Sequence, residues 1–382
     1  MSLVLNTNVV IDNFNTATLL GADIVHVLTH FHSDHRPGLT SNFRGRLICS
    51  SVTSKLVVHQ LGVNSSFVEP LEYNLWLPIR GSTEENVNDF EILFADANHC
   101  PGSVCVLLRG SGFSYFYSGD FRVNSYVIRN IKLFGLSKFD IGFIDSTFYD
   151  QRGMWDVMPS TYNSLDALLN FLKSWSGKLA FEFDMLGTEI LLEAVIEHFP
   201  HTKVVVTTAK RFHELDIIYS NSSYIMSRLV LGDPDACKSR FIMISRDCPT
   251  PQGYTRLRPS TQRWAKLIRS NTTGDSCNFL EHDAERNIVY LFFSTHSCKK
   301  EIDTFLETFN IQEVRMLGKS IEVISDEDGP LEAEVATEQR TSVRRFEYSC
   351  DSAWLESISS TQETVFQVDQ DEVILPLRDC SH

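Results

Sequence analysis

The chain has 382 residues, of which 43% are hydrophobic and 22% are charged, and its formal net charge is -15. This length suggests two domains, or one large domain with an insertion, and the composition is that of a globular protein with a substantial core. The sequence contains no run of about 18 apolar residues and no recognisable secretory signal, so neither a membrane protein nor an exported one is expected.

The negative charge is concentrated near the C-terminus. Residues 321–382 contain 15 acidic and 4 basic residues, a net charge of -11, which leaves -4 for the first 320 residues. The total charge argues against a nucleic-acid partner. In the first 320 residues, however, the acidic and basic residues nearly balance. We expect residues 321–382 to form an acidic extension that recruits a protein partner. The nine cysteines are scattered and include no CxxC pair, which predicts a reduced intracellular protein.

Short apolar runs separated by turns predict the strands of the first part of the chain, at residues 24–28, 91–95, 104–108, 114–118 and 141–144. The third and fourth runs flank Gly110 and Gly112, which indicates a β-hairpin. Residues 164–175 have the apolar periodicity of a helix, with Ser164 as its N-cap.

From residue 178 onward, strands and helices alternate. The predicted strands are residues 178–183, 203–207, 241–245, 287–294 and 312–317, and the predicted helices are residues 187–199, 209–217 and 299–309. This alternation predicts a parallel α/β unit inserted into the first domain. We expect the first domain to comprise residues 1–155 and 287–320, the insertion residues 156–286, and the extension residues 321–382.

Residues 29–35 read Thr-His-Phe-His-Ser-Asp-His and follow an apolar run directly. In extended backbone, His30 and His32 point to one side, and Asp34 and His35 follow after the chain has turned. Two pairs of ligands from one loop suit two metal ions about 3.5–4 Å apart. So dense a cluster of imidazole and carboxylate groups predicts metal binding.

Two further candidate ligands follow other predicted strands. His99 lies in Asp-Ala-Asn-His-Cys-Pro-Gly-Ser, and Asp120 lies in Tyr-Ser-Gly-Asp-Phe-Arg. Taken singly, each would be explained better as an ordinary polar residue of a loop than as a metal ligand. Together with the histidine cluster, they supply a third histidine for one metal ion and a carboxylate that is able to bridge two.

These motifs resemble those of a known family. Residues 30–35 look like the HxHxDH signature of the metallo-β-lactamase fold, and the segments around His99, Asp120 and Asp145 resemble the β-CASP nucleases that process DNA, the group that contains Artemis and Apollo. The resemblance runs from about residue 10 to about residue 317. It implies an α/β fold, a metallo-β-lactamase αββα sandwich that carries an inserted α/β β-CASP domain.

The resemblance also implies a role for each motif residue. The ligands of one zinc ion are matched by three histidines, His30, His32 and His99. Asp34 and His35 match the ligands of the other ion, and Asp120 matches the bridge, so the implied cofactor is zinc, as one or two divalent ions.

Three further residues match the family outside this ligand set. Asp12 matches an aspartate that orients the ligand loop, and Asp145 matches an acidic residue beside the metals. His296 matches a late histidine that faces the scissile phosphate, which makes it a candidate general acid. Without the resemblance, a strand-end histidine bound to backbone would explain His296 better.

Two features bear on the branch of the family. Residues 183–189 resemble a segment that usually ends in Gly-Lys-Glu, but Thr188 replaces the lysine. Residues 313–318 contain no histidine, whereas the RNA-processing branch carries one there. This absence favours the DNA-processing branch.

One basic stretch is a candidate for DNA contact. Residues 256–269 carry five positive charges, no acid and one tryptophan. Cations bind phosphate and tryptophan stacks on bases, so the candidate contacts are Arg256, Arg258, Arg263, Trp264 and Lys266. On charge alone, a solvated helix face with a core tryptophan explains the pattern equally well.

The expected function is that of a zinc-dependent phosphodiesterase acting on DNA, as a 5′-to-3′ exonuclease in interstrand cross-link repair or end processing. The expected partner is DNA with a free 5′ end, and no association with a membrane is expected. The resemblance implies that the protein acts in the nucleus, or otherwise in the cytoplasm. Three alternatives remain. They are a small-molecule or thioester hydrolase, which would need neither the insertion nor the basic stretch, an RNA endonuclease, and a non-catalytic scaffold that binds DNA ends.

Overall fold

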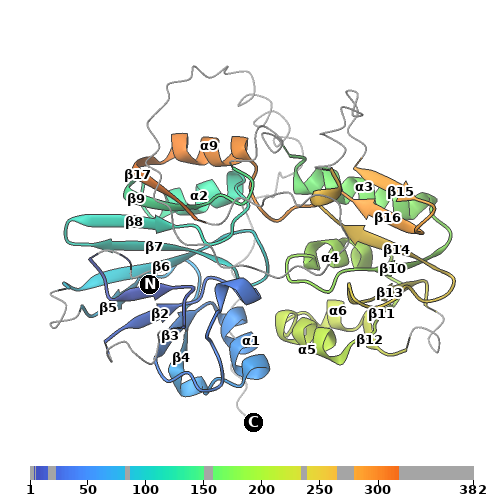
Figure 1. The fold of residues 1–382 in the computed structure, drawn as a ribbon, viewed down its shortest axis with the longest axis horizontal. Helices are drawn as coiled ribbons and strands as arrows, with labels where there is room; N and C mark the ends of the chain where they lie inside the picture. The colour runs from blue at the N-terminus through green and yellow to red at the C-terminus, as the bar shows by residue number, and fades with distance from the viewer. Residues whose placement is uncertain are drawn as a thin grey trace, which may run out of the picture. The chain divides into compact units, whose positions relative to one another are not determined.

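The computed structural model describes residue 4 and residues 6–15, 23–81, 87–149, 158–233, 239–264 and 279–317, which belong to one compact unit, Met1–Pro330. Their strands form three sheets of four, six and seven strands (Figure 1). Within this described part, no helix has the length and apolar character needed to cross a membrane. The acidic extension predicted at residues 321–382 lies outside the described residues.

The first sheet is parallel throughout. Its strands, in spatial order, are β1 (Val9–Ile11), β2 (Val25–Val27), β3 (Arg46–Cys49) and β4 (Val68–Pro70). β1 and β2 are buried over their whole length. Runs of buried β-branched residues are typical of strands that are covered on both faces.

The second sheet carries the predicted hairpin. Its strands, in spatial order, are β17 (Asn310–Leu317), β9 (Lys138–Asp145), β8 (Phe113–Tyr117), β7 (Val104–Gly110), β6 (Phe90–Asp96) and β5 (Leu77–Ile79). The β7–β8 hairpin is confirmed, with Gly110 paired to Phe113 across the turn. β9 lies parallel to both β8 and β17.

The two sheets pack face to face. Ile11 and Val27 of the first sheet belong to one apolar cluster with Phe94 and Val106 of the second. Helices cover the two outer faces, and they are α1 (Ser51–Leu61), α2 (Ser125–Leu133) and α9 (Lys299–Thr308). α1 packs on the first sheet, and α2 and α9 pack on the second (Figure 1). This layering is the predicted αββα sandwich of the metallo-β-lactamase fold.

The insertion forms the third sheet. Its strands, in spatial order, are β12 (Leu229–Leu231), β11 (Val204–Val206), β13 (Phe241–Met243), β10 (Lys178–Phe181), β14 (Tyr254–Pro259), β16 (Ile288–Leu291) and β15 (Leu280–Asp283). Only β15 is antiparallel to its neighbour. The described helices of the insertion include α3 (Thr161–Ser174), α4 (Glu189–His198), α5 (Ala209–Ile218) and α6 (Ser223–Met226). The parallel α/β unit is therefore confirmed.

One predicted helix start needs correction, and the strand pairing bears on one predicted domain boundary. Ser164 is not the N-cap of α3, because the helix begins one turn earlier and Ser160 accepts the capping hydrogen bond from Asn163. The boundary expected between residues 286 and 287 would cut the hairpin of β15 and β16, and β16 also pairs with β14. We therefore propose that the insertion extends through Leu291 and that the chain returns to the sandwich after it.

Candidate metal centre

Three histidines from two loops converge on one point. His30 and His32 follow β2, and His99 follows β6. The Nδ1 atom of His32 lies 2.9 Å from Nε2 of His30 and 3.2 Å from Nε2 of His99. A carboxylate oxygen of Asp120 lies within 4.8 Å of all three ring nitrogens. This set of three nitrogens and one oxygen is the donor chemistry that Zn²⁺ takes in proteins.

The opposite ring nitrogens are each held by a second partner. His30 Nδ1 lies 3.0 Å from the hydroxyl of Thr29, His32 Nε2 lies 3.1 Å from the Leu186 carbonyl oxygen, and His99 Nδ1 lies 2.9 Å from the Thr295 carbonyl oxygen. A carbonyl oxygen can only accept, so the last two contacts place the proton on the outer nitrogen. The inner nitrogens then offer their lone pairs to the centre.

Asp12 contacts the ligand loop. One carboxylate oxygen accepts from the Thr29 backbone nitrogen at 2.8 Å. The other accepts from the Thr29 hydroxyl at 2.7 Å and pairs with His35 Nδ1 at 2.8 Å. Asp12 thus contacts both the backbone before His30 and the ring of His35, and its orienting role stays a prediction.

Asp120 lies at the middle of the cluster. Its Oδ2 atom is 3.6 Å from His30 Nε2 and 3.5 Å from His99 Nε2, and its Oδ1 atom is 3.2 Å from His35 Nε2. Burial alone would raise the pKa of the Asp120 carboxyl, but the hydrogen bond from His35 and the charges of nearby histidines hold it well below 3.8. The carboxylate is therefore ionised, and its two oxygens face two sides of the site.

His296 and Asp145 lie beside the histidine cluster, with the ring of His296 4.7 Å from that of His99. His296 Nδ1 lies 2.9 Å from Asp145 Oδ2, and its Nε2 lies 3.8 Å from Asp120 Oδ2. Asp145 also accepts from the backbone and hydroxyl of Thr147, at 2.9 and 2.7 Å. Asp120, Asp145 and His296 form a second group whose donor atoms are close enough to hold a cation.

The structure brings Asp34 least closely into the site. Its side chain is 77% exposed, and its nearest oxygen lies 3.9 Å from His35 Nε2. His35 itself lies inside, between Asp12 and Asp120. The ligand roles of Asp34 and His35 at a second metal ion stay predictions.

The electrostatics of the site fit a bound cation. Burial lowers the pKa of His30 and His99 well below 6.5, and it also lowers that of His32, so these rings are neutral, as metal ligands must be. Burial would likewise lower the pKa of His35, but Asp12 and Asp120 raise it to about 11. A positive charge is therefore favoured where His35 Nε2 faces Asp120.

The chain is similar in sequence to several known proteins. The chain is 30% identical over 235 residues to DNA ligase 6 of Arabidopsis thaliana, 32% identical over 170 residues to DNA cross-link repair protein SNM1 of the same organism, and 36% identical over 120 residues to 5′ exonuclease Apollo of Gallus gallus. These alignments cover 60%, 44% and 31% of this chain, but only 15%, 32% and 24% of the relatives. Over these stretches the chain is similar in sequence to the Apollo and SNM1 proteins.

No family model matches the chain. A protein of unknown function from Enterococcus faecalis V583 has a similar fold, with a TM-score of 0.50 at 12% identity, over 77% of this chain and 75% of that one. This likeness supports the fold alone. The chain spans less than a third of the length of each curated relative named above.

A loop of the insertion reaches the candidate metal centre. His32 Nε2 donates to the carbonyl oxygen of Leu186 in that loop. The next residue, Gly187, has a φ of 100°, and a Cβ atom there would lie 3.0 Å from the backbone oxygen of His99. Glycine is therefore required by both the backbone conformation and the close approach.

Arg211 of α5 holds this loop and was not predicted from the sequence. The residue is 3% exposed. Its guanidinium donates to the carbonyl oxygens of Phe183 and Met185, at 3.1 and 3.3 Å, and pairs with Glu189 at 2.7 Å. Glu189 in turn accepts from the backbone nitrogen of Gly187 at 2.6 Å. A continuous set of hydrogen bonds thus joins α5 to the loop that orients His32.

The predicted DNA contacts of the basic stretch need correction. Arg256 is buried and pairs with Glu182 at 3.0 Å, which also binds Arg258 at 2.8 Å. Arg263 pairs with Glu281. Trp264 is 1% exposed and stacks on Phe292, so it is a core residue and offers no face to a base. The last of the five candidates, Lys266, lies outside the described residues.

Proposed function

We propose that this chain is a metal-dependent nuclease that hydrolyses phosphodiester bonds in DNA, as a 5′-to-3′ exonuclease in DNA repair or end processing. The observation that carries the proposal is the position of Asp120, which is shared by the three-histidine group and the group of Asp145 and His296. The printed names of the relatives, DNA cross-link repair proteins and 5′ exonucleases, point to the substrate.

The residues of the site fit a divalent metal ion, which we propose to be zinc. When bound, the metal would polarise a phosphate oxygen and lower the pKa of a water molecule to about 7. Four residues, His30, His32, His99 and Asp120, would hold the first ion. Asp120, His35 and Asp34 would hold a second, with Asp12 keeping the ring of His35 in place.

We propose that His296 serves as the general acid. Burial would lower the pKa of its imidazole, but the charge of Asp145 and the hydrogen bond to it raise the pKa above 6.5. Because Nδ1 is directed to Asp145, the proton available for donation is on Nε2, which faces the centre. His296 would give this proton to the leaving oxygen as the P–O bond breaks. Asp145 would fix the ring and stabilise its charged form.

DNA is the proposed substrate rather than RNA. Residues 313–318 lack the histidine of the RNA-processing branch, and the relatives' names refer to DNA. We further propose a requirement for a free 5′ end, action in the nucleus, and a protein partner for residues 321–382. A non-catalytic scaffold would not need neutral, buried imidazoles arranged around an ionised carboxylate.

Digestion of end-labelled single-stranded DNA tests the proposal. The substrates carry either a 5′ phosphate or a 5′ hydroxyl, and each is incubated with and without a chelator. We expect chelator-sensitive release of mononucleotides from the 5′ end. Hydrolysis of RNA or of a small ester, with no hydrolysis of DNA, would overturn the proposal.

A further inference from the structure

Arg122 uses every N–H group of its guanidinium within the protein. The residue is 3% exposed. Its Nε and Nη2 atoms donate to one carboxylate oxygen of Glu301, at 3.1 and 2.9 Å, and Nη2 also donates to the carbonyl oxygen of Pro159 at 2.9 Å. Its Nη1 atom donates to the carbonyl oxygens of Ser294 and His296, at 3.3 and 3.0 Å. A guanidinium has five N–H donors, and all five have an acceptor here.

The segment that carries His296 is held in place by such contacts. Between β16 and α9 this segment contains no helix or strand, so hydrogen bonds from neighbouring segments fix it. Besides Arg122, the Ser294 hydroxyl donates to the His296 carbonyl oxygen at 3.0 Å. The backbone nitrogen and the hydroxyl of Ser297 both donate to the Phe121 carbonyl oxygen, at 3.0 and 2.8 Å. We propose that Arg122 is a positioning residue that holds the ring of His296 at the metal centre, an inference that rests on the proposed nuclease function.

The backbone of Arg122 is bound to the loop that carries His99. Its nitrogen donates to the Ala97 carbonyl oxygen at 2.9 Å, and its carbonyl oxygen accepts from the Asn98 side chain at 3.0 Å. Asp120, which lies at the middle of the cluster, precedes Arg122 by two positions. One residue thus connects the candidate metal ligands to the segment of the proposed general acid, and it sets the distance between them.

An ion pair that only stabilises the fold is the competing explanation. Glu301 accepts from two of the five donors, but the other three donate to backbone carbonyl oxygens on two different connections. Pro159 lies just before α3 of the insertion, and Ser294 and His296 lie after β16, where the chain returns to the sandwich. A pair that stabilised the fold alone would need only Glu301. The three carbonyl contacts instead fix both connections, and the returning one carries His296.

The substitution Arg122→Lys tests the proposal. An ammonium group has three donors and no planar fork, so it cannot bind Glu301 and all three carbonyl oxygens. At saturating metal, kcat on single-stranded DNA should fall about 10²-fold, the cost of a displacement of roughly 1 Å at the reacting groups. KM and metal content should match the wild type. On the p-nitrophenyl ester of a nucleotide, whose leaving group needs no proton, the rate should be nearly unchanged.

A double variant distinguishes positioning from a general effect on the fold. Arg122→Lys combined with His296→Ala should lose no more activity on DNA than His296→Ala alone, because the ring that Arg122 positions is already absent. If Arg122 acted only through the fold, the losses would multiply, and the double variant would be about 10²-fold slower than His296→Ala. Multiplied losses would overturn the proposal.

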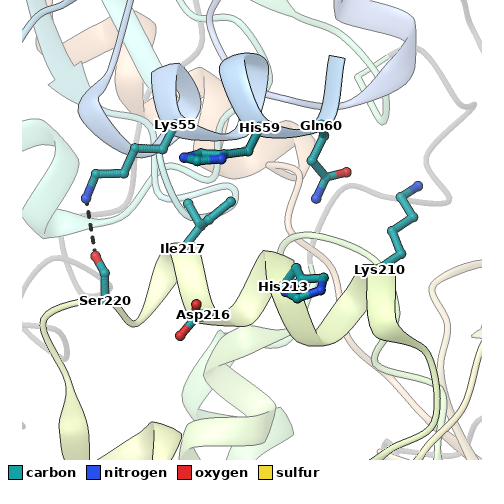
Figure 2. A pocket seen from close by; sticks show the side chains of 8 residues that line it. All are labelled: Lys55, His59, Gln60, Lys210, His213, Asp216, Ile217 and Ser220. Atoms are coloured by element: carbon teal, nitrogen blue, oxygen red, sulfur yellow. Dashed lines mark hydrogen bonds between the residues drawn. The ribbon is translucent and has the colours of Figure 1, made fainter. Parts of the chain in front are cut away.

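Two control variants separate positioning from loosening of the insertion. Arg240→Lys alters another arginine, whose guanidinium likewise binds two backbone carbonyl oxygens, those of Leu172 and Trp175. Ser220→Ala removes a contact between the sandwich and the insertion, in which Lys55 of α1 donates to the Ser220 hydroxyl at 3.2 Å (Figure 2). Neither substitution alters the segment between β16 and α9, so both variants should keep the wild-type ratio of activities on the two substrates.

Ser294→Ala is a milder variant, which keeps the test valid should Arg122→Lys fold poorly. It removes the other donor to the His296 carbonyl oxygen and should lower kcat on DNA about 5-fold, the cost of one hydrogen bond, with little effect on the p-nitrophenyl ester. Equal losses on both substrates in these two variants, with a loss confined to DNA in His296→Ala, would overturn the role of Arg122 alone. An inactive wild type, or equal losses in His296→Ala, would instead overturn the nuclease or general-acid proposal on which this inference rests.

Discussion

His32 donates a hydrogen bond from Nε2 to the carbonyl oxygen of Leu186, which lies 3.1 Å away and 154 positions further along the chain. The ligand belongs to the sandwich and the carbonyl belongs to the insertion. The insertion therefore contributes directly to the orientation of a candidate metal ligand. Partners of this kind fix the ring and increase its basicity, and their loss typically lowers metal affinity 10- to 100-fold.

We predict that Arg211→Lys weakens metal binding. An ammonium group cannot reproduce the planar set of bonds to Phe183, Met185 and Glu189, so the loop carrying Leu186 should shift away from His32. Metal affinity, measured by competition with a chromophoric chelator, should fall about 10-fold. The control is Glu214→Gln, which alters the other side of the guanidinium, 3.3 Å away, without touching the loop. Unchanged affinity in the lysine variant would show that the loop holds its position unaided.

The general-acid role of His296 predicts a dependence on the leaving group. His296→Ala should lower kcat on DNA about 10²- to 10⁴-fold, because an alkoxide leaves poorly without a proton. On the p-nitrophenyl ester of a nucleotide the loss should be much smaller, since nitrophenolate needs no proton to leave. Metal content should stay at the wild-type level. Equal losses on both substrates, or loss of metal, would make His296 a ligand and not an acid.

A buried histidine outside the site predicts a pH effect on stability. His26 is 1% exposed and packs between Phe14 and Phe43, and neither ring nitrogen has a hydrogen-bond partner among the described residues. Burial lowers its pKa below 6.5. The unfolded chain therefore binds a proton more readily, and the stability due to neutral His26, present above pH 6.5, is lost as the pH falls below that value.

The substitution His26→Leu should remove this loss. As the pH is lowered below 6.5, the Tm of the wild type should decrease more than the Tm of the variant. His201→Leu, which replaces an exposed histidine, should behave as the wild type does. Parallel Tm curves for the wild type and His26→Leu would mean that the buried ring is protonated without penalty.

The candidate ligands that the structure brings together were predictable because their signal is local. His30, His32 and His35 lie within six consecutive residues, and His99 and Asp120 each directly follow a strand that the sequence pattern predicts. Arg211 was not predictable in this way. Its partners Phe183 and Glu189 are 28 and 22 positions away, so only the fold of the insertion brings them together.

Other features were missed or misassigned. β1, β4 and β5, of three residues each, were not predicted, although the equally short β2, β11 and β13 were. The basic stretch looked free of acids because Glu182 and Glu281, which neutralise its arginines, come from other strands. A charge pattern along the sequence does not reveal such pairing.

The most direct test of the central claim is the release of mononucleotides from 5′-phosphorylated single-stranded DNA by the wild type and Asp120→Asn, with metal content determined in the same samples. The wild type should release nucleotides only when metal is present, and activity removed by a chelator should return when zinc is added. Asp120→Asn should stay folded and be inactive at every metal concentration, because the shared carboxylate is missing. Full activity in Asp120→Asn, or in the chelated wild type, would contradict the account.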